Sequence, residues 1–204
     1  KENIKRIIKE ICSVDSVADG ASYDADTVEA EDITVNKEYH GVRVYVVAHL
    51  DTACQRISMD IGFGDVVTPT PQKLAFPTLI DTVPQAEIMA YSLETVVAEK
   101  FHAMIALSLA NSRMKDFFDV YSILITDRVD GEILADAIKF TFANRETGFR
   151  ENHPLFTEDF FTSTDRKAFW NGFLRKIKYK ESLDFPTVGL LIKQRLQPYW
   201  ESLK

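Results

Sequence analysis

Cysteine, glycine and proline are all scarce in this sequence, and its apolar runs are short. The 204 residues include 2 Cys, 8 Gly and 7 Pro, which excludes disulfide-rich and collagen-like proteins. Cys12 and Cys54 are expected to be buried free thiols in a reducing cytoplasm, with a disulfide as the alternative. The longest apolar runs are four or five residues, whereas a membrane-spanning helix needs about 20. A membrane protein is therefore not expected.

Several common functional motifs are also missing. The chain has no P-loop, no GxGxxG and no GxSxG. Its four histidines have no metal-ligand spacing to one another or to cysteine, so a zinc site is not expected; they are His40, His49, His102 and His153. What the chain does contain is a large core fraction, with 46% hydrophobic and 11% aromatic residues. This length and composition predict one ordinary domain, or two small ones.

Charge is distributed unevenly along the chain. The net charge of -7 argues against a protein that simply coats nucleic acid. Residues 166–180, however, contain no acid and a group of basic residues, namely Arg166, Lys167, Arg175, Lys176, Lys178 and Lys180. Such a strip indicates either a phosphate-binding surface or a solvated helix face.

The first half of the chain favours strands. Isoleucines at helical spacing predict a helix over residues 4–11, and the polar stretch 13–26 is expected to be a loop. Three strand-like runs follow, at 28–35, 42–49 and 56–63, with a turn at 39–41. The valine-rich second run is expected to be buried on both faces. Short connections between these runs predict an antiparallel meander. The segment 68–84 carries four prolines and is expected to be extended.

The second half favours helices. The pattern changes to helical spacing after Ala90, with Ser92 as an expected N-cap. The predicted helices cover 92–110, 113–125, 131–142, 164–177 and 185–203, with a break at 111–112 and a loop at 144–154. Strands followed by helices indicate the α+β class, a small antiparallel or mixed sheet followed by a helical C-terminal bundle. The expected domains are 1–90 and 91–204.

Lys100 interrupts the apolar face of the first of these long helices. Helical spacing places it between Val97 and Met104, and places Ala98 and His102 on the other side. An unpaired ammonium is too costly to bury. Lys100 must therefore pair with a carboxylate, extend its charged end to solvent, or contact an anionic ligand.

Asp116 presents the opposite anomaly on the next helix. It projects at the edge of the apolar face, whereas Lys115 and Asp119 are expected to point outward. Lys100 and Asp116 could form a structural ion pair, or they could be two walls of one polar pocket. In either case we expect their charged groups to lie roughly 3–5 Å apart.

Asp60 is an unusual residue for a strand because Met59 and Ile61 flank it. Metal-dependent phosphoryl and nucleotidyl transfer requires carboxylates that converge on divalent ions. The alternative is a structural carboxylate beside a bulge, since glycines follow at Gly62 and Gly64. Asp24-Ala25-Asp26 is a weaker candidate, because it lies in the predicted polar loop.

The order of these motifs resembles a known family. The segments that carry the resemblance are Arg56–Asp65 (RISMDIGFGD), Phe76–Leu79 (FPTL), Tyr91–Lys100 (YSLETVVAEK) and Asn111–Asp119 (NSRMKDFFD). The succession is similar to that of the AbiEii/AbiGii-type nucleotidyltransferase toxins, distant members of the DNA polymerase β-like superfamily. It covers residues 1–127 well and the C-terminal helices loosely.

The resemblance implies a function, a ligand set and partners. It implies a bacterial cytoplasmic toxin that transfers NMP from an NTP to an RNA acceptor, with tRNA as one candidate, and that a cognate antitoxin opposes. It matches Lys100 and Asp116 to catalytic positions, and Asp60 to a ligand of Mg²⁺ or Mn²⁺. Arg113, Lys115 and Asp119 match the remaining nucleotide- and phosphate-binding positions.

One expected motif of the family is missing. The family has a small-residue turn and an Asp-x-Asp strand before the opening helix, and this chain begins at Lys1 without methionine. We therefore expect an N-terminally truncated chain, which as a fragment could be inactive. A non-catalytic binding module with an acidic docking face is one rival interpretation. An NTP-dependent phosphotransferase is another.

The basic strip suggests where RNA could bind. In the helix 164–177 the apolar stripe is expected to be core, with a base-stacking platform as the alternative, and it comprises Phe169, Trp170, Phe173, Leu174 and Ile177. The basic residues Arg166, Lys167, Arg175 and Lys176 should then face solvent, followed by Lys178. We interpret Arg175, Lys176 and Lys178 as a weakly supported RNA-binding track, because phosphates require clustered cations.

Overall fold

The computed structural model describes residues 1–14, 20–36, 39–64, 66–78 and 82–204. The chain divides into two compact units. The sheet unit comprises residues 1–65 and 78–84, and the helical unit comprises residues 66–77 and 85–204.

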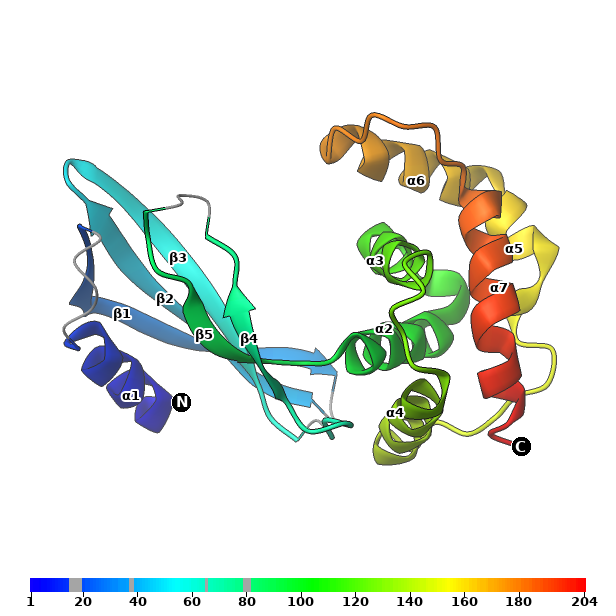
Figure 1. The fold of residues 1–204 in the computed structure, drawn as a ribbon, viewed down its shortest axis with the longest axis horizontal. Helices are drawn as coiled ribbons and strands as arrows, with labels where there is room; N and C mark the ends of the chain where they lie inside the picture. The colour runs from blue at the N-terminus through cyan, green and yellow to red at the C-terminus, as the bar shows by residue number, and fades with distance from the viewer. Residues whose placement is uncertain (15–19, 37–38, 65, 79–81) are drawn as a thin grey trace. The chain divides into compact units, whose positions relative to one another are not determined.

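In its described residues, the sheet unit contains one helix and three strands, which Figure 1 shows. Helix α1 (Glu2–Cys12) precedes the strands β1 (Ala21–Asn36), β2 (Tyr39–Leu50) and β3 (Ala53–Gly62). The strand order is β1-β2-β3, and both pairs are antiparallel. The predicted helix and the predicted antiparallel meander are therefore confirmed.

One face of this sheet forms a small core. Val42, Val44 and Val46 alternate along β2 and are buried, and they pack with Ile8 of α1 and with Val28. Period-two alternation sends the residues between them to the opposite face, where Arg43 and Tyr45 lie. The expectation that β2 is buried on both faces was therefore wrong, because an antiparallel sheet needs cover on only one side.

The limits of β1 also differ from expectation. The strand begins at Ala21, so residues 21–26 are not the predicted loop, and residues 39–41 lie in β2 rather than in a turn. Residues 15–19 of the predicted loop lie outside the described residues. The pairing of β1 with β2 shifts between Asp24 and Glu29, and such an irregularity lets a polar segment remain in a strand.

The cysteines are less buried than expected. Both are free thiols, as predicted, but Cys12 is half-buried and Cys54 is exposed. Cys54 pairs with His49 at one end of the β2–β3 ladder, outside the apolar core.

The helical unit begins with a hairpin that the sequence did not reveal. Strands β4 (Gln72–Phe76) and β5 (Ala86–Ala90) pair in antiparallel register. The proline-rich segment 68–84 was expected to be extended, and its residues Gln72–Phe76 form the extended strand β4. Its prolines lie outside the two strands, so they interrupt no hydrogen bond of the ladder.

The remaining elements of this unit are helical (Figure 1). All five long helices were predicted with bounds close to these, whereas the short helix α5 was missed. The elements are α2 (Leu93–Leu107), η1 (Ser108–Ala110), α3 (Met114–Leu124), α4 (Gly131–Asn144), η2 (Pro154–Phe156), α5 (Glu158–Thr162), α6 (Thr164–Lys176) and α7 (Phe185–Glu201). Sheets followed by helices confirm the α+β class.

The core of this unit surrounds α2 and α3. Phe101 and Met104 of α2 and Phe117 of α3 are completely buried. The opposite side of α2 is buried as well, because α4 packs there and covers Ala98 and His102. The expectation that these two residues face away from the core was wrong. A helix that is covered on two sides has no single inward stripe.

A close approach joins α5 and α7. A Cβ atom added at Gly189 of α7 would lie 2.2 Å from Cγ of Phe161. Only glycine leaves room for the phenylalanine ring here, and Phe161 also contacts the rings of Phe117 and Phe185. This contact fixes α7 against the end of the core that carries α3.

Candidate functional site

The first candidate residue, Lys100, is positioned by the start of α2. The hydroxyl of Ser92 accepts a hydrogen bond from the backbone N–H of Thr95, which confirms the predicted N-cap. The Thr95 hydroxyl in turn donates to the carbonyl of Thr68, at 2.7 Å. Two turns later, Lys100 projects from the part of α2 that faces α3.

The other candidates are positioned by the start of α3. Its N-terminal segment is anchored by Asn111, which is buried and whose Oδ1 accepts a hydrogen bond from the N–H of Arg113, at 2.8 Å. Helical spacing then brings Asp116 and Asp119 to the α2 side, since residues three apart share a face. Met114 and Phe117 hold the same helix in the core.

Five charged side chains from α2 and α3 form one cluster. The Lys100 Nζ lies 2.8 Å from Oδ1 of Asp116 and 2.8 Å from Oδ2 of Asp119. Asp116 also pairs through Oδ2 with Arg113 Nε, at 3.0 Å, and Asp119 pairs with Lys115 Nζ, at 2.6 Å. We call this group the charge cluster. It contains three cations and two carboxylates, so its formal charge is positive.

Exposure differs sharply within the charge cluster. The side chain of Asp116 is 6% exposed and that of Lys100 is 23% exposed. Arg113 and Lys115 are 58% and 72% exposed. The cluster therefore has a buried centre at Lys100 and Asp116, and two cations at its solvent edge.

The contacts of Lys100 keep it protonated. Burial lowers its pKa, but the hydrogen bonds to Asp116 and Asp119 outweigh burial and hold the pKa above its ordinary value. Burial likewise raises the pKa of Asp119, and the hydrogen bonds from Lys100 and Lys115 lower it further than burial raises it. Lys100 is thus a fixed cation at neutral pH.

The geometry confirms one sequence prediction and corrects another. Lys100 and Asp116 were predicted to lie within ion-pair reach, and their charged atoms are in direct contact. Asp119 was expected to point outward, but it contacts Lys100 and is only 22% exposed. The apolar stripe of α3 marks the side that faces the core, whereas the packing of α2 on α3 decides which flanking residues meet Lys100.

Asp60 lies in the sheet unit, on the exposed face of β3. Register places it opposite Arg43 of β2. Arg43 donates two hydrogen bonds to it, Nε to Oδ1 at 2.6 Å and a terminal nitrogen to Oδ2 at 2.8 Å. The hydrogen bond from Arg43 lowers the pKa of Asp60 below its ordinary value. Sequence analysis missed Arg43, although the predicted antiparallel pairing of these strands was a signal that could have identified it.

The surroundings of Asp60 are a ladder of charged and polar side chains. Arg56 pairs with Glu29 at 2.7 Å and lies over the ring of Tyr45. The Tyr45 hydroxyl donates to Glu31 at 2.7 Å. Asp60 thus belongs to an exposed polar face in which each carboxylate has a partner.

The oxygens of Asp60 suit a hard divalent cation, but the described residues supply no complete metal site. Mg²⁺ and Mn²⁺ prefer several oxygen ligands. Across the described ranges, no three His, Cys, Asp or Glu side chains come together in a group that could hold a metal ion. Asp60 alone is one candidate ligand, and Arg43 now occupies both of its oxygens.

The weaker motif at residues 24–26 also has a structural role. Asp24 Oδ1 accepts a hydrogen bond from the backbone N–H of Asp26, and the Asp24 carbonyl accepts from Thr27. These contacts stabilise the irregular part of β1.

The basic strip divides into two groups: Arg166 and Lys167 lie in the first turn of α6, and Arg175, Lys176, Lys178 and Lys180 lie at its end and beyond it. Arg175, Lys176 and Lys178 are exposed, as predicted. Arg166 was expected to face solvent, but it is half-buried, donates to the carbonyl of Leu109 at 2.6 Å and lies over the ring of Phe160. Phe169 was expected in the core and is instead exposed.

The rest of the predicted apolar stripe of α6 is divided. Trp170 is fully buried and donates to the carbonyl of Leu183, whereas Phe173 and Leu174 are half-buried. Ile177 is exposed, contrary to expectation. The buried face of α6 is therefore narrower than the spacing of its apolar residues predicted.

His102 forms a buried hydrogen-bond network that sequence analysis missed. Arg145 contacts Nδ1 of His102 at 3.1 Å, and Nε2 contacts the Thr147 hydroxyl at 2.8 Å. Because Arg145 can only donate, we assign the ring proton to Nε2. Burial, followed by the nearby charge of Arg145, lowers the pKa of His102 to about 4.

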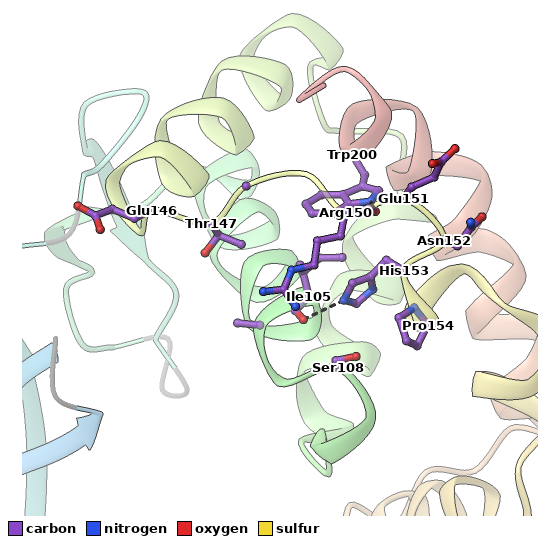
Figure 2. A pocket seen from close by; sticks show the side chains of 12 residues that line it. Ile105, Ser108, Glu146, Thr147, Arg150, Glu151, Asn152, His153, Pro154 and Trp200 are labelled. Carbon is purple, nitrogen blue, oxygen red and sulfur yellow. Dashed lines mark hydrogen bonds between the residues drawn. The ribbon is translucent and has the colours of Figure 1, made fainter.

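A pocket of about 470 Å³ lies beside the loop that follows α4 (Figure 2). Its wall includes Ile105, Trp200 and His153, whose Nε2 contacts the carbonyl of Ile105 at 3.1 Å. The side chain of Arg150 extends toward Ile105, whereas the carboxylates of Glu146 and Glu151 point away from Ile105 (Figure 2). No residue of the charge cluster lines this pocket.

A comparison with protein families identifies the chain. The model of the family described as nucleotidyl transferase AbiEii toxin, type IV TA system, matches residues 1–200. Among the curated proteins and the solved structures, none matches. The chain belongs to the AbiEii family of nucleotidyltransferase toxins, as the resemblance of its motifs predicted.

None of the helices that the structure describes combines the length and the apolar character needed to cross a membrane.

Proposed function

From membership of the AbiEii family, we propose that this chain transfers a nucleoside monophosphate from an NTP to an RNA acceptor, with tRNA as a candidate. The family belongs to type IV toxin–antitoxin systems, which implies an antitoxin partner. In the reaction, an acceptor hydroxyl oxygen bonds to the α-phosphorus, its proton passes to solvent, and pyrophosphate leaves. We propose that this takes place in the cytoplasm of a bacterium.

The observation that carries this proposal is the charge cluster. Lys100 and Asp116 lie at its buried centre, and we propose them as the catalytic residues. Lys100 offers a permanent positive charge to a developing phosphate charge, which a preorganised site can stabilise strongly. Its raised pKa argues against a role as a covalent nucleophile, since the protonated amine has no free electron pair.

Arg113, Lys115 and Asp119 suit the binding of the nucleotide. Arg113 and Lys115 are the exposed cations of the cluster, so a triphosphate can reach both from solvent. Their carboxylate partners, Asp116 and Asp119, keep the two cations on the same side of α3. A triphosphate would share these cations with the carboxylates, because charge-assisted hydrogen bonds can be divided between acceptors.

For the divalent cation, we propose Asp60 as one ligand. Mg²⁺ or Mn²⁺, when bound, would neutralise triphosphate charge as a Lewis acid. Arg43 would have to release at least one Asp60 oxygen before the metal ion could bind there, because both oxygens now accept from it. Asp60 would need further oxygen ligands in addition to its own.

The exposed cations Arg175, Lys176 and Lys178 support the assignment of RNA as the acceptor. An acidic protein with a net charge of -7 must concentrate its cations locally to bind a phosphate backbone. Changing these three residues together to glutamine should weaken RNA binding and flatten its salt dependence while leaving NTP affinity unchanged.

The transfer itself can be tested with labelled nucleotides. The protein is incubated with total RNA and with each NTP, labelled in parallel on the α- or the γ-phosphate. We expect the α-label, and not the γ-label, to appear in RNA. Lys100→Met and Asp116→Asn should each reduce the transfer about 100-fold or more. Lys139→Met and Asp136→Asn are matched controls on α4, where both side chains are exposed, and they should retain activity.

Each alternative activity gives a different result. Transfer of the γ-label would identify a phosphotransferase instead. Absence of any transfer with all four NTPs would favour a non-catalytic binding module. If Lys100→Met and Lys139→Met transferred the α-label equally well, the charge cluster would have no role in the reaction.

A further inference from the structure

Phe169 lies in the middle of helix α6, and its side chain is exposed although α6 packs in the core through other apolar residues. The helix packs through Trp170, which is fully buried, while Phe169 remains 53% exposed. In the described part of the chain, no ring contact is recorded for Phe169, whereas Trp170 and Phe173 each contact other rings. About half of the Phe169 side chain is therefore available to solvent.

The surface beside Phe169 is open. Gly172 lies less than one turn further along the helix, and a Cβ atom added there would meet no atom within 4 Å. Ala168, the preceding residue, is small and exposed. A flat ring placed on Phe169 would therefore meet no larger side chain at these two positions.

Positive charge lies on both sides of Phe169 along the helix, since Arg166 and the exposed Lys167 precede it. Arg175 and Lys176 follow Gly172 within the next turn and are exposed, whereas the nearest acid, Asp165, precedes Phe169. Basic residues in a last helical turn also offset the helix dipole. That role gives no reason for an exposed phenylalanine one to two turns earlier, so the aromatic residue is a separate observation.

An exposed aromatic ring followed by cations is the arrangement that binds unpaired RNA. Proteins hold single strands by stacking bases on aromatic side chains and by pairing the backbone phosphates with basic residues. We propose that Phe169 is the stacking platform for one unpaired base of the RNA acceptor, and that Arg175 and Lys176 bind the phosphates that follow it. The proposal rests on the proposed function, because it assumes an RNA acceptor.

The platform can be tested by binding, without catalysis. The probe is a fluorescein-labelled twelve-nucleotide oligouridylate, and a twelve-base-pair RNA duplex is the comparison. Phe169→Ala should weaken binding of the single strand about 5- to 100-fold, the effect expected from the loss of one stacked base. It should leave duplex binding and the salt dependence unchanged, because it removes no charge. Phe169→Trp should restore the affinity.

Phe140 supplies the matched control. It lies on α4, is 46% exposed and is outside the basic strip. Phe140→Ala removes the same side chain from a comparable environment, so it should not alter binding of either RNA. Changing Arg175, Lys176 and Lys178 to glutamine should instead weaken both RNAs and reduce the slope of log affinity against log salt by roughly 1–2.

The outcomes separate this proposal from the one on which it rests. If the unaltered protein binds the single strand and Phe169→Ala behaves like Phe140→Ala, the platform is wrong and the RNA acceptor stands. If the unaltered protein binds neither RNA, the RNA acceptor is itself wrong. If Phe169→Ala leaves RNA binding intact but abolishes neutralisation by the antitoxin, the surface docks a protein partner, and the platform is overturned.

Discussion

Each of the two units contains an ion pair between a basic side chain and an aspartate, but the two pairs differ in how deeply they are buried. In the helical unit, Lys100 and Asp116 are joined at 2.8 Å with the carboxylate almost completely buried. In the sheet unit, Arg43 and Asp60 are joined at 2.6 Å, with 39% of the Arg43 side chain and 55% of the Asp60 side chain exposed. Both carboxylates stood out in the sequence as charges among apolar neighbours. Only one of them became part of a buried structure.

The two pairs differ in the free energy that would be lost if one charge of the pair were removed. A buried charge without a partner is costly, because water cannot replace the missing contact. An exposed charge is solvated whether or not it is paired, so an exposed ion pair contributes little to stability. The helical unit therefore depends on the charge cluster for stability, whereas the Arg43–Asp60 pair can open for a ligand at a small cost in free energy.

The largest expected effect comes from removing the buried charge of Asp116. Asp116→Asn should lower the free energy of unfolding of the helical unit by about 3 kcal/mol, because Lys100 and Arg113 lose a shared partner. Both tryptophans, Trp170 and Trp200, are buried in this unit, so denaturant unfolding followed by tryptophan fluorescence measures it. Asp136→Asn is the exposed control. Equal midpoints for the two variants would contradict the distinction between buried and exposed carboxylates.

The next effect is acid sensitivity of the helical unit. The folded pKa of His102 is about 4, below its ordinary value of 6.5. The unfolded chain therefore binds a proton that the folded chain does not, and stability is lost as the pH falls from 6.5 toward 4. The full contribution is about 3–4 kcal/mol, at 1.36 kcal/mol per pKa unit, and about 2 kcal/mol of it is lost between pH 7 and pH 5. His153, whose pKa burial also lowers, acts in the same direction.

His102→Gln provides the test of this pH dependence. Free energies of unfolding measured at pH 7, 6 and 5 by tryptophan fluorescence should fall less steeply in His102→Gln than in the unaltered protein. Parallel pH profiles for the two proteins would show that His102 does not titrate as its burial requires.

A smaller effect is expected for the cation at the centre of the charge cluster. Lys100→Met should lower the free energy of unfolding by about 1–2 kcal/mol, less than Asp116→Asn, since Asp116 keeps Arg113 and Asp119 keeps Lys115. The same measurement as for Asp116→Asn applies, with Lys139→Met as the control. If Lys100→Met lowered the free energy of unfolding more than Asp116→Asn does, the stability of the cluster would depend on the lysine more than on the aspartate.

The smallest expected effect is in the sheet unit. Arg43→Gln should not change the denaturation midpoint measurably, because the pair is exposed. It should raise the pKa of Asp60 toward its ordinary value, because the hydrogen bond from Arg43 lowers that pKa. A carboxyl NMR titration of Asp60 measures the change. An unchanged Asp60 titration would contradict the bidentate contact.

The ion pair of Lys100 and Asp116 could be predicted because helical periodicity is a local property. Each residue lies at the edge or in the middle of an apolar stripe, and burial of one charge requires another. Asp119 could not be assigned in this way. Its contact with Lys100 depends on how α3 packs on α2, and a single helix carries no information about that packing.

The apolar residues of α6 give the same lesson. Five of them follow helical spacing, and all were predicted to be core. Only Trp170 is completely buried, and Phe169 is exposed beside Gly172. Spacing identifies which residues share a face, but the neighbouring elements decide how much of that face they cover.

By itself, the sequence determined the order of the first three strands and the five long helices, the helix cap at Ser92 and the buried ion pair, and its motifs identified the family. The structural features follow from short-range physics, namely side-chain periodicity, capping hydrogen bonds and the cost of a lone buried charge, whereas the family follows from the resemblance of the motifs. The tertiary structure alone decided the β4–β5 hairpin, the inward position of Asp119 and the exposure of Phe169. Each of these depends on which surfaces meet, and contacts between distant segments fix that choice.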